Sequence, residues 1–193
     1  MTEYIVRAKD LRKESELDKV PKGIGYYKWY AEKQDLNLLL RKLGLSFDSI
    51  PQDQWDIENG LYCIYLGIAK KSLRERLDWH VNDHHTINAV RSGALSTFRQ
   101  SLSSVLFSDQ SKEQDTNSFI DRLTIHFFYF ENLNSESDID KKTIEAKETG
   151  LINQYLHILN GSKNHNCFRA GKRLRELRML GKAKGIEQLS SKL

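Results

Sequence analysis

The chain has 193 residues, of which 39% are hydrophobic and 29% are charged, and its formal net charge is +4. This composition is typical of a soluble globular protein and excludes a mainly disordered chain. No apolar run reaches the roughly 18 residues of a membrane span, and the N-terminus lacks the pattern of a signal peptide. We therefore expect a cytoplasmic protein with one core and terminal extensions, and no membrane partner.

Charge is distributed unevenly along the chain. Residues 161–193 hold nine Lys and Arg against two Glu, which gives this segment +7 and leaves −3 for residues 1–160. Such asymmetry is typical of contact with a polyanion, although a solvated helix face gives the same count. The two cysteines, Cys63 and Cys167, form no C-x-x-C pair, so we expect neither a zinc site nor a disulfide framework.

The first half of the chain contains two strand-like runs separated by a long insertion. Residues 1–20 alternate charged and apolar residues, which predicts a short helix or an arm. An aromatic run over 24–31 predicts a strand, and residues 60–66 predict a second strand that Gly67 ends. The intervening residues 31–59 are longer than a hairpin needs, and we expect a helix inside this insertion.

A helix is predicted directly after the second strand. Ser72 can cap its first turn while Glu75 reaches back, as in a capping box. Arg76 and His80 then lie on the same helical face as two leucines. One explanation is that Arg76 extends to solvent and His80 is an ordinary surface imidazole. The other is that both residues line a site.

The second half contains an amphipathic helix over 96–107, a third strand over 123–130 and a helix over 141–160. Arg99 lies on the polar face of the first of these helices, where it could hold phosphate or face solvent. Glu148 falls on the apolar stripe of the last of them. A carboxylate on a buried face is costly unless it is paired or binds a cation, so Glu148 is a candidate functional residue.

The C-terminal segment has a further helical pattern, with leucines on one side and cations around it. The cations of residues 172–178 could meet phosphate or form a solvated face. Gly181 and Gly185 predict a chain that loosens toward its end.

Two short motifs resemble the signature that names the GIY-YIG nucleases. Gly25-Tyr26-Tyr27 resembles its first half and Tyr65-Leu66-Gly67 its second half, with departures at the apolar centres. In this family an arginine and a histidine follow on a helix, and a later helix carries a glutamate, with an asparagine further on. The residues that match the family in order are Tyr27, Tyr65, Arg76, His80, Glu148 and Asn160.

The resemblance implies an α+β fold with a small three-stranded antiparallel β-sheet flanked by helices. It assigns residues 21–160 to the nuclease-like domain, with the insertion at about 31–59. Residues 1–20 are then an N-terminal extension, and residues 161–193 are a basic C-terminal extension.

The resemblance also implies a metal-dependent DNA endonuclease. Glu148 is expected to hold one Mg²⁺ or Mn²⁺ ion per active site, with water completing the coordination. Arg76 is expected to stabilise the extra negative charge of the transition state.

Roles for the other matching residues follow from the same resemblance. Tyr27 is expected to act as general base, with Tyr65 and His80 orienting water and phosphate. The two tyrosines could exchange these roles. Asn160 is expected to brace the site.

Binding to double-stranded DNA is expected to come from cations near the site and in the C-terminal segment, although each could equally be an ordinary solvated side chain. These candidate nucleic-acid-binding residues are Lys70, Lys71, Arg74, Arg99, Lys172 and Arg173. A chain of this size that cuts both strands suggests a homodimer with one copy per strand.

Three functions are compatible with these patterns. The first is a type II restriction endonuclease that recognises a palindrome. The second is a repair, mobile-element or defence nuclease that reads DNA structure instead of sequence. The third is a DNA-binding module without catalysis. The intact set of Tyr, Arg and Glu argues against the third, because a binding module has no use for a carboxylate that faces phosphate.

Overall fold

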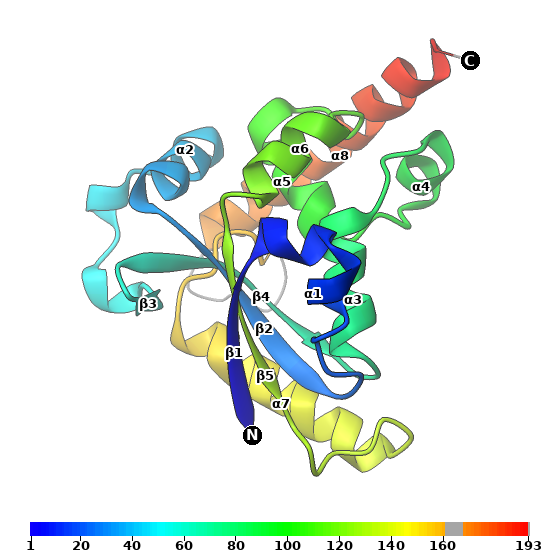
Figure 1. Ribbon diagram of the computed structural model, residues 1–193. Helices are drawn as coiled ribbons and strands as arrows, with labels where there is room; N and C mark the ends of the chain where they lie inside the picture. Colours follow the sequence, from blue (N-terminus) through cyan, green and yellow to red (C-terminus); the bar gives the residue numbers. More distant parts are fainter. Residues whose placement is uncertain (161–167, 193) are drawn as a thin grey trace.

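A five-stranded antiparallel sheet forms the centre of the molecule, with its strands in the order β1-β5-β2-β4-β3 (Figure 1). The computed structural model describes residues 1–160 and 168–192. β2 lies in the middle of the sheet and pairs with β5 on one side and β4 on the other. The strands are β1 (Thr2–Arg7), β2 (Gly25–Ala31), β3 (Ile57–Glu58), β4 (Leu61–Ala69) and β5 (Thr124–Tyr129).

The α+β class is confirmed, but the expectation of a three-stranded sheet is wrong. β2, β4 and β5 are the three strands that the sequence predicts. β1 forms where we predicted a helix or an arm, and it pairs along its whole length with β5. Its side chains alternate between exposed and half-buried, as an edge strand requires, but only Tyr4 and Val6 pack against the core. Two apolar side chains are too few for the strand pattern to stand out in the sequence.

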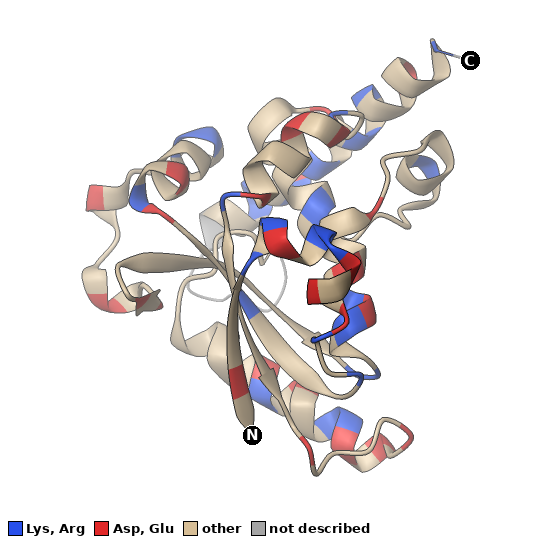
Figure 2. Ribbon diagram, in the orientation of Figure 1, with Lys and Arg blue, Asp and Glu red and all other residues tan. Residues whose placement is uncertain are grey.

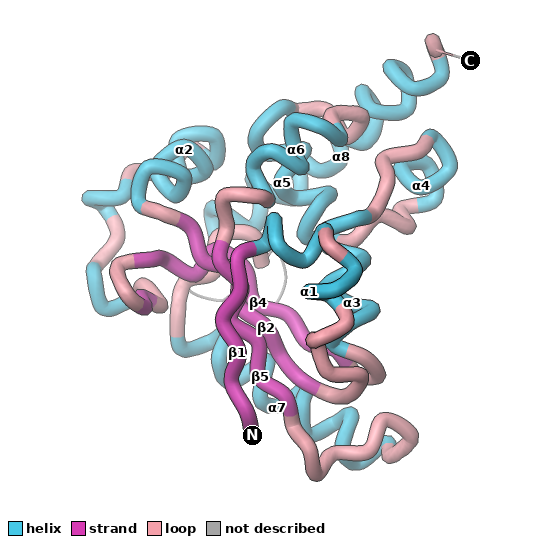
Figure 3. The backbone as a smooth tube through the Cα atoms, viewed as in Figure 1, coloured by secondary structure: helices cyan, strands magenta, loops and turns pink. Residues whose placement is uncertain are grey.

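Helices surround the sheet, and the tube view separates them clearly from the strands (Figure 3). The insertion between β2 and β4 contains the helix that we expected, and Gly44 ends it in a left-handed conformation with φ of 74°. The α-helices are α1 (Glu14–Leu17), α2 (Lys33–Leu43), α3 (Leu73–Asn82), α4 (Ile87–Ser92), α5 (Thr97–Phe107), α6 (Glu113–Ile120), α7 (Asp138–Gln154) and α8 (Phe168–Ser190). The short 3₁₀ helices are η1 (Ala8–Arg12), η2 (Phe47–Ser49) and η3 (Gln52–Gln54).

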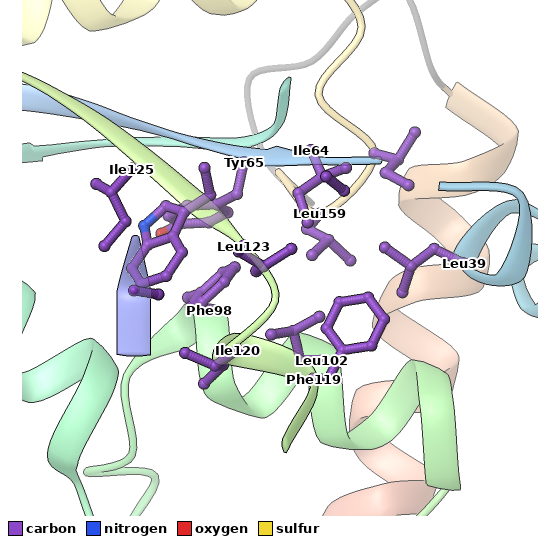
Figure 4. Packing of buried hydrophobic residues seen from close by; sticks show 14 of the residues in the cluster. Leu39, Ile64, Tyr65, Phe98, Leu102, Phe119, Ile120, Leu123, Ile125 and Leu159 are labelled. Carbon is purple, nitrogen blue, oxygen red and sulfur yellow. The ribbon is translucent and has the colours of Figure 1, made fainter. Parts of the chain in front are cut away.

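The two faces of the sheet pack against different helices. On one face, Tyr27 and Tyr65 belong to the main hydrophobic core, to which α2, α3, α5 and α8 contribute (Figure 4 labels Tyr65 and its neighbour Phe98). On the other face, Tyr26 packs against Ile144 of α7 in a smaller cluster. Successive strand residues point to opposite faces, so of the two adjacent tyrosines only Tyr27 faces α3.

α8 continues as one helix past both glycines at which we predicted the chain to loosen. That prediction is wrong because the glycines are packing residues. A Cβ atom at Gly181 would overlap Ser104, and one at Gly185 would lie 3.1 Å from backbone atoms of Gln110. The backbone N–H of Gln110 also donates to the carbonyl of Gly181 (2.9 Å). The small residues thus let α8 lie directly against α5, as Figure 3 shows.

The described helices include none that is both long and apolar enough to cross a bilayer. Cys63 is buried as a free thiol, and Cys167 lies outside the described residues. Burial raises the pKa of the Cys63 thiol well above its ordinary value, so this thiol stays protonated at pH 7.

Candidate active site

Tyr27 is fully buried at the centre of the sheet. Its partner across the β2–β4 strand pair is Gly67. A side chain at position 67 would overlap the Tyr27 hydroxyl, so glycine is needed there to leave room for the tyrosine ring. The two motif halves therefore meet across one strand pair, and the glycine of the second makes space for the tyrosine of the first.

α3 brings two polar groups to Tyr27. Ser72 caps this helix by accepting a hydrogen bond from the backbone N–H of Glu75 (3.2 Å), as the sequence predicts. Farther along α3, Nε of Arg76 donates to the Tyr27 hydroxyl (3.1 Å), and Nε2 of His80 lies 2.7 Å from the same oxygen. His80 is completely buried. Both polar residues that interrupt the apolar face of α3 thus converge on one hydroxyl.

The electrostatics of this group keep it neutral apart from Arg76. Burial raises the pKa of Tyr27 to about 12, although the charge and hydrogen bond of Arg76 act to lower it. Burial, together with the charges of Arg76 and Arg99, lowers the pKa of His80 well below its ordinary value. A neutral imidazole can accept the Tyr27 proton in a hydrogen bond or, in its other tautomer, donate to the Tyr27 oxygen. His80 is therefore a suitable partner for either charge state of the hydroxyl.

Tyr65 lies on the same face of the sheet and is 6% exposed. Its ring packs against Phe98 of α5, with ring centroids 5.1 Å apart (Figure 4). Burial raises the pKa of Tyr65, Tyr27 adds to the rise, and the charges of Arg76 and Arg178 oppose it. The second tyrosine therefore shares the electrostatic environment of the first and also interacts with a cation of α8.

Glu148 reaches this group from α7, which packs against β2 and β4. Its carboxylate interacts electrostatically with both tyrosines and with Arg76. Beside it, Lys70 at the end of β4 forms an ion pair with Glu145, which ties α7 to this end of the strand. Two hydroxyls, a guanidinium and a carboxylate from distant parts of the sequence therefore lie within electrostatic range of one another.

Asn160 braces the outer edge of β4. Its side-chain amide donates to the carbonyl of Leu66 (2.7 Å) and accepts from the Leu66 N–H (2.9 Å). β3 pairs only with the first two residues of β4, so the Asn160 side chain satisfies backbone groups that no strand reaches. Since Leu66 lies between Tyr65 and Gly67, Asn160 holds the backbone of the second motif in place.

A pocket of about 530 Å³ opens beside Arg76, where the end of β4 leads into α3. The Arg76 guanidinium lies over the ring of Trp79, 4.5 Å from its centroid, at one wall of this pocket. Three cations against one carboxylate make the pocket suitable for an anion such as phosphate. The lining residues are Ile68, Ala69, Lys70, Lys71, Ser72, Glu75, Arg76 and Trp79.

Comparison with known families agrees with this arrangement. The family model described as the GIY-YIG catalytic domain matches residues 25–182. The chain belongs to the GIY-YIG nuclease family. Neither the curated proteins nor the solved structures yielded a match. The matched range includes most of α8.

The predicted DNA-binding cations of this GIY-YIG domain lie in different settings. Lys71 is exposed at the pocket, and Lys70 lines the same pocket. Arg74 instead holds the N-terminal segment: its Nε donates to the carbonyl of Val20 (2.9 Å) and its Nη1 pairs with Asp18 (2.8 Å). Lys70 also forms an ion pair, with Glu145, so Lys71 is the cation of these three that is best placed to meet an anion.

The structure does not support the assignment of Arg99 to DNA binding, because this side chain is completely buried. Nε donates to Nε2 of His85 (3.0 Å), Nη1 to the carbonyls of His80 and Val81 (3.0 Å each), and Nη2 to Oδ1 of Asn117 (2.6 Å). The face of α5 that is polar in the sequence therefore packs against protein. Arg99 joins α5 to the end of α3, and four of its five N–H donors already bind acceptors inside the protein.

α8 carries Lys and Arg along much of its length (Figure 2). Lys172 and Arg173 are exposed, and Arg173 pairs with Glu176 (3.4 Å). Arg178 is one of the cations of residues 172–178 that could meet phosphate or form a solvated face, and its charge acts on Tyr65. The available signal was its position beside Leu177 and Gly181 on the packing face, but the sequence does not say what that face meets.

Two groups of potential metal ligands lie apart from this site within the described part of the chain, and Glu148 belongs to neither. The first group is buried, and the Lys28 ammonium already pairs with its aspartate (2.8 Å), which supplies the positive charge there. We therefore interpret that group as part of the core. The groups are Asp56, Cys63 and His157, and Glu3, Glu58 and His126.

Proposed function

We propose that this protein is a metal-dependent endodeoxyribonuclease that hydrolyses phosphodiester bonds in double-stranded DNA. The observation that carries the proposal is the convergence of the Tyr27 hydroxyl, the Arg76 guanidinium and the Glu148 carboxylate beside a pocket suited to an anion. These groups come from β2, α3 and α7, and family membership supports nuclease chemistry. Hydroxyl, guanidinium and carboxylate are the groups that such hydrolysis requires.

Tyr27 acts as the general base in this mechanism and takes the proton of the attacking water. As a phenolate, its oxygen would accept hydrogen bonds from Nε of Arg76 and from Nε2 of His80. These two donors stabilise the negative charge that a base at this position must carry. Tyr65 is the alternative base, because Arg76 acts on it too and it is slightly more exposed than Tyr27.

The donor set at Glu148 suits a hard divalent cation. Mg²⁺ or Mn²⁺ would be held by this carboxylate with water as further ligands, because such ions prefer oxygen ligands and often keep their water. When bound, the ion supplies charge stabilisation to the phosphate and the leaving oxygen. Arg76 provides a fixed guanidinium for a non-bridging phosphate oxygen.

Among biological roles, we favour a cytoplasmic type II restriction endonuclease that acts as a homodimer on a palindrome. Two copies would place one active site on each strand. A repair, mobile-element or defence nuclease that reads DNA structure uses the same chemistry and is the second candidate. A DNA-binding module without catalysis is the third.

Cleavage of supercoiled plasmid tests the proposal. The wild-type protein should cut with Mg²⁺ or Mn²⁺ and lose all cutting in EDTA. Glu148→Gln, which keeps the shape of the side chain but removes its charge, should lower the rate at least about 10²-fold. Glu187→Gln, which changes an exposed carboxylate of α8, is the matched control and should cut at the wild-type rate.

The products decide between the roles. Discrete fragments support restriction, whereas nicking or smearing supports a nuclease that reads structure. DNA binding without metal-dependent cleavage by the wild-type protein supports the binding module and overturns the nuclease proposal. Equal cleavage by wild type and Glu148→Gln would remove Glu148 from the mechanism.

A further inference from the structure

The guanidinium of Arg178 acts on Tyr65 from the C-terminal helix. It belongs to α8, is half-buried, and interacts electrostatically with Tyr65. Within the described residues, no carboxylate forms an ion pair with it. Arg76, by contrast, interacts with Glu148 as well as with both tyrosines. Arg178 is therefore a partly desolvated cation without an acidic partner in the part of the chain that the structure describes, a costly arrangement unless an anion completes it.

α5 orients this guanidinium. Nη2 of Arg178 donates to Oε1 of Gln100 (2.9 Å). The amide of Gln100 is itself oriented, because its Nε2 donates to the carbonyls of Gly93 (3.1 Å) and Leu95 (2.5 Å). Phe98, two residues earlier on α5, packs against Tyr65. One helix thus positions both the arginine and the tyrosine.

The backbone of α8 is anchored at the same place. The Nε2 group of Gln110 donates to the carbonyl of Arg178 (3.3 Å), and the backbone N–H of Gln110 donates to the carbonyl of Gly181 (2.9 Å). Gly181 lies directly against Ser104 of α5. These contacts fix the backbone of α8 within one turn of Arg178, and the hydrogen bond to Gln100 orients the guanidinium, so the charge is positioned before any ligand arrives.

We propose that Arg178 binds a DNA phosphate next to the one at Arg76, so that guanidinium groups from α3 and α8 flank Tyr65. The proposal rests on the nuclease function and extends it, because it makes the basic C-terminal helix part of the substrate site. A guanidinium presents a planar set of donors that matches phosphate oxygens, and the phosphate would supply the missing negative charge.

Binding to duplex DNA in EDTA, where no cleavage is expected, tests the contact directly. Each phosphate contact adds about 0.9 to the slope of log K against log salt, so Arg178→Gln should lower the slope by about 0.9. Arg178→Lys keeps the charge and should keep the slope, although it loses the planar set of donors of the guanidinium. Arg41→Gln, which removes an exposed arginine of α2, is the matched control and should bind as wild type does.

A series of duplexes, each with one uncharged methylphosphonate linkage, locates the phosphate. Arg178→Gln should lose no further affinity on the duplex whose neutral linkage replaces the contacted phosphate, whereas wild type should lose affinity there. In Mg²⁺, Arg178→Gln should also lower kcat/KM at least about tenfold, as expected for a lost charged contact. Additive losses on every duplex would overturn the contact.

The two proposals fail in different ways. If wild type cleaves and Arg178→Gln keeps both the wild-type slope and the wild-type kcat/KM, the Arg178 contact is wrong and the nuclease stands. If wild type binds but does not cleave, the nuclease is wrong and the salt slope still decides the contact. Thermal unfolding shows whether each variant is folded. If Arg178→Gln is unfolded, the kcat/KM of Arg178→Lys decides. Lysine lacks the planar donor set of the guanidinium, so Arg178→Lys should have a lower kcat/KM than wild type. A wild-type kcat/KM would count against the contact.

Discussion

The Tyr27 hydroxyl and Nε2 of His80 lie 2.7 Å apart, and neither residue is exposed to solvent. The imidazole is enclosed by aromatic rings, with the centroids of Trp29 and Phe98 at 5.9 Å and 5.6 Å. Its Nδ1 has no hydrogen-bond partner in the described part of the protein. The contact with Tyr27 is therefore the polar interaction that a histidine supplies here and an apolar residue could not.

Replacement of His80 by Phe should lower kcat about 10²-fold and leave KM within a few-fold, because the Tyr27 oxygen loses a partner while the cations that line the pocket stay in place. Single-turnover cleavage measures the effect. His84→Phe is the control, since the side chain of His84 is 77% exposed. A His80→Phe enzyme with the wild-type rate would show that the imidazole only fills space.

Loss of the Tyr27 hydroxyl in Tyr27→Phe should lower the rate at least about 10²-fold, and Tyr65→Phe should have a smaller effect. In the proposed mechanism the reactive form is the phenolate, and the pKa of Tyr27 is raised to about 12, so the wild-type rate should rise with pH from 7 to 10. Tyr27→Phe should lose this rise. If Tyr65→Phe loses it instead, the two tyrosines exchange roles.

Asn160→Ala should lower the free energy of unfolding by about 1–3 kcal/mol, because both backbone groups of Leu66 lose their partner. Asn160→Asp can still accept from the Leu66 N–H but cannot donate to its carbonyl, so it should lie between wild type and Asn160→Ala. Urea unfolding measures both values. Asn132→Ala, at an exposed loop position, is the control, and equal stability of all these proteins would contradict the bracing role.

Acid should destabilise the protein through His85. Its Nδ1 donates to the carbonyl of Gln110 (2.7 Å) and its Nε2 accepts from Arg99 (3.0 Å), so a second proton would face a guanidinium. Burial and the charge of Arg99 lower the pKa of His85 to about 4. The unfolded chain therefore binds more protons than the folded one below pH 6.5, and stability is lost as the pH falls from 6.5 toward 4.

The loss from His85 should be about 2 kcal/mol between pH 7 and pH 5, as measured by urea unfolding at each pH. His85→Gln keeps a neutral acceptor and donor but does not titrate, so its stability should depend less on pH by about that amount. An identical pH dependence of the free energy of unfolding in wild type and His85→Gln would show that protonation of His85 does not affect stability.

A methyl group at position 67 should disturb the site, whereas one at position 150 should not. Gly67→Ala would overlap the Tyr27 hydroxyl and should cost about 1–3 kcal/mol of stability as well as activity. Gly150→Ala, in α7, meets no atom within 4 Å and should stabilise the helix by about 0.5–1 kcal/mol. Thermal unfolding and plasmid cleavage measure both variants. Equal activity of the two would show that Tyr27 can shift without loss.

Local patterns were sufficient for much of the framework. The cap at Ser72, the helix inside the insertion and the strands that contain Tyr27 and Tyr65 each depend on a few neighbouring residues, and the structure confirms them. β1 could not be recognised in this way, because it is stabilised by pairing with β5, far along the chain. Strand pairing at such a distance leaves little trace in the local sequence.

The sequence by itself determined which chemical groups the protein has and the order in which they occur, and its helical and strand periods assigned most of them to the right elements. Only the tertiary structure decided which charges meet solvent and which meet one another. Arg99 and Arg178 both flank apolar positions of amphipathic helices, yet Arg99 is buried among protein acceptors while Arg178 is half-buried and acts electrostatically on Tyr65. The physical reason is that the cost of placing a charge depends on what packs opposite it, and those partners come from remote parts of the chain.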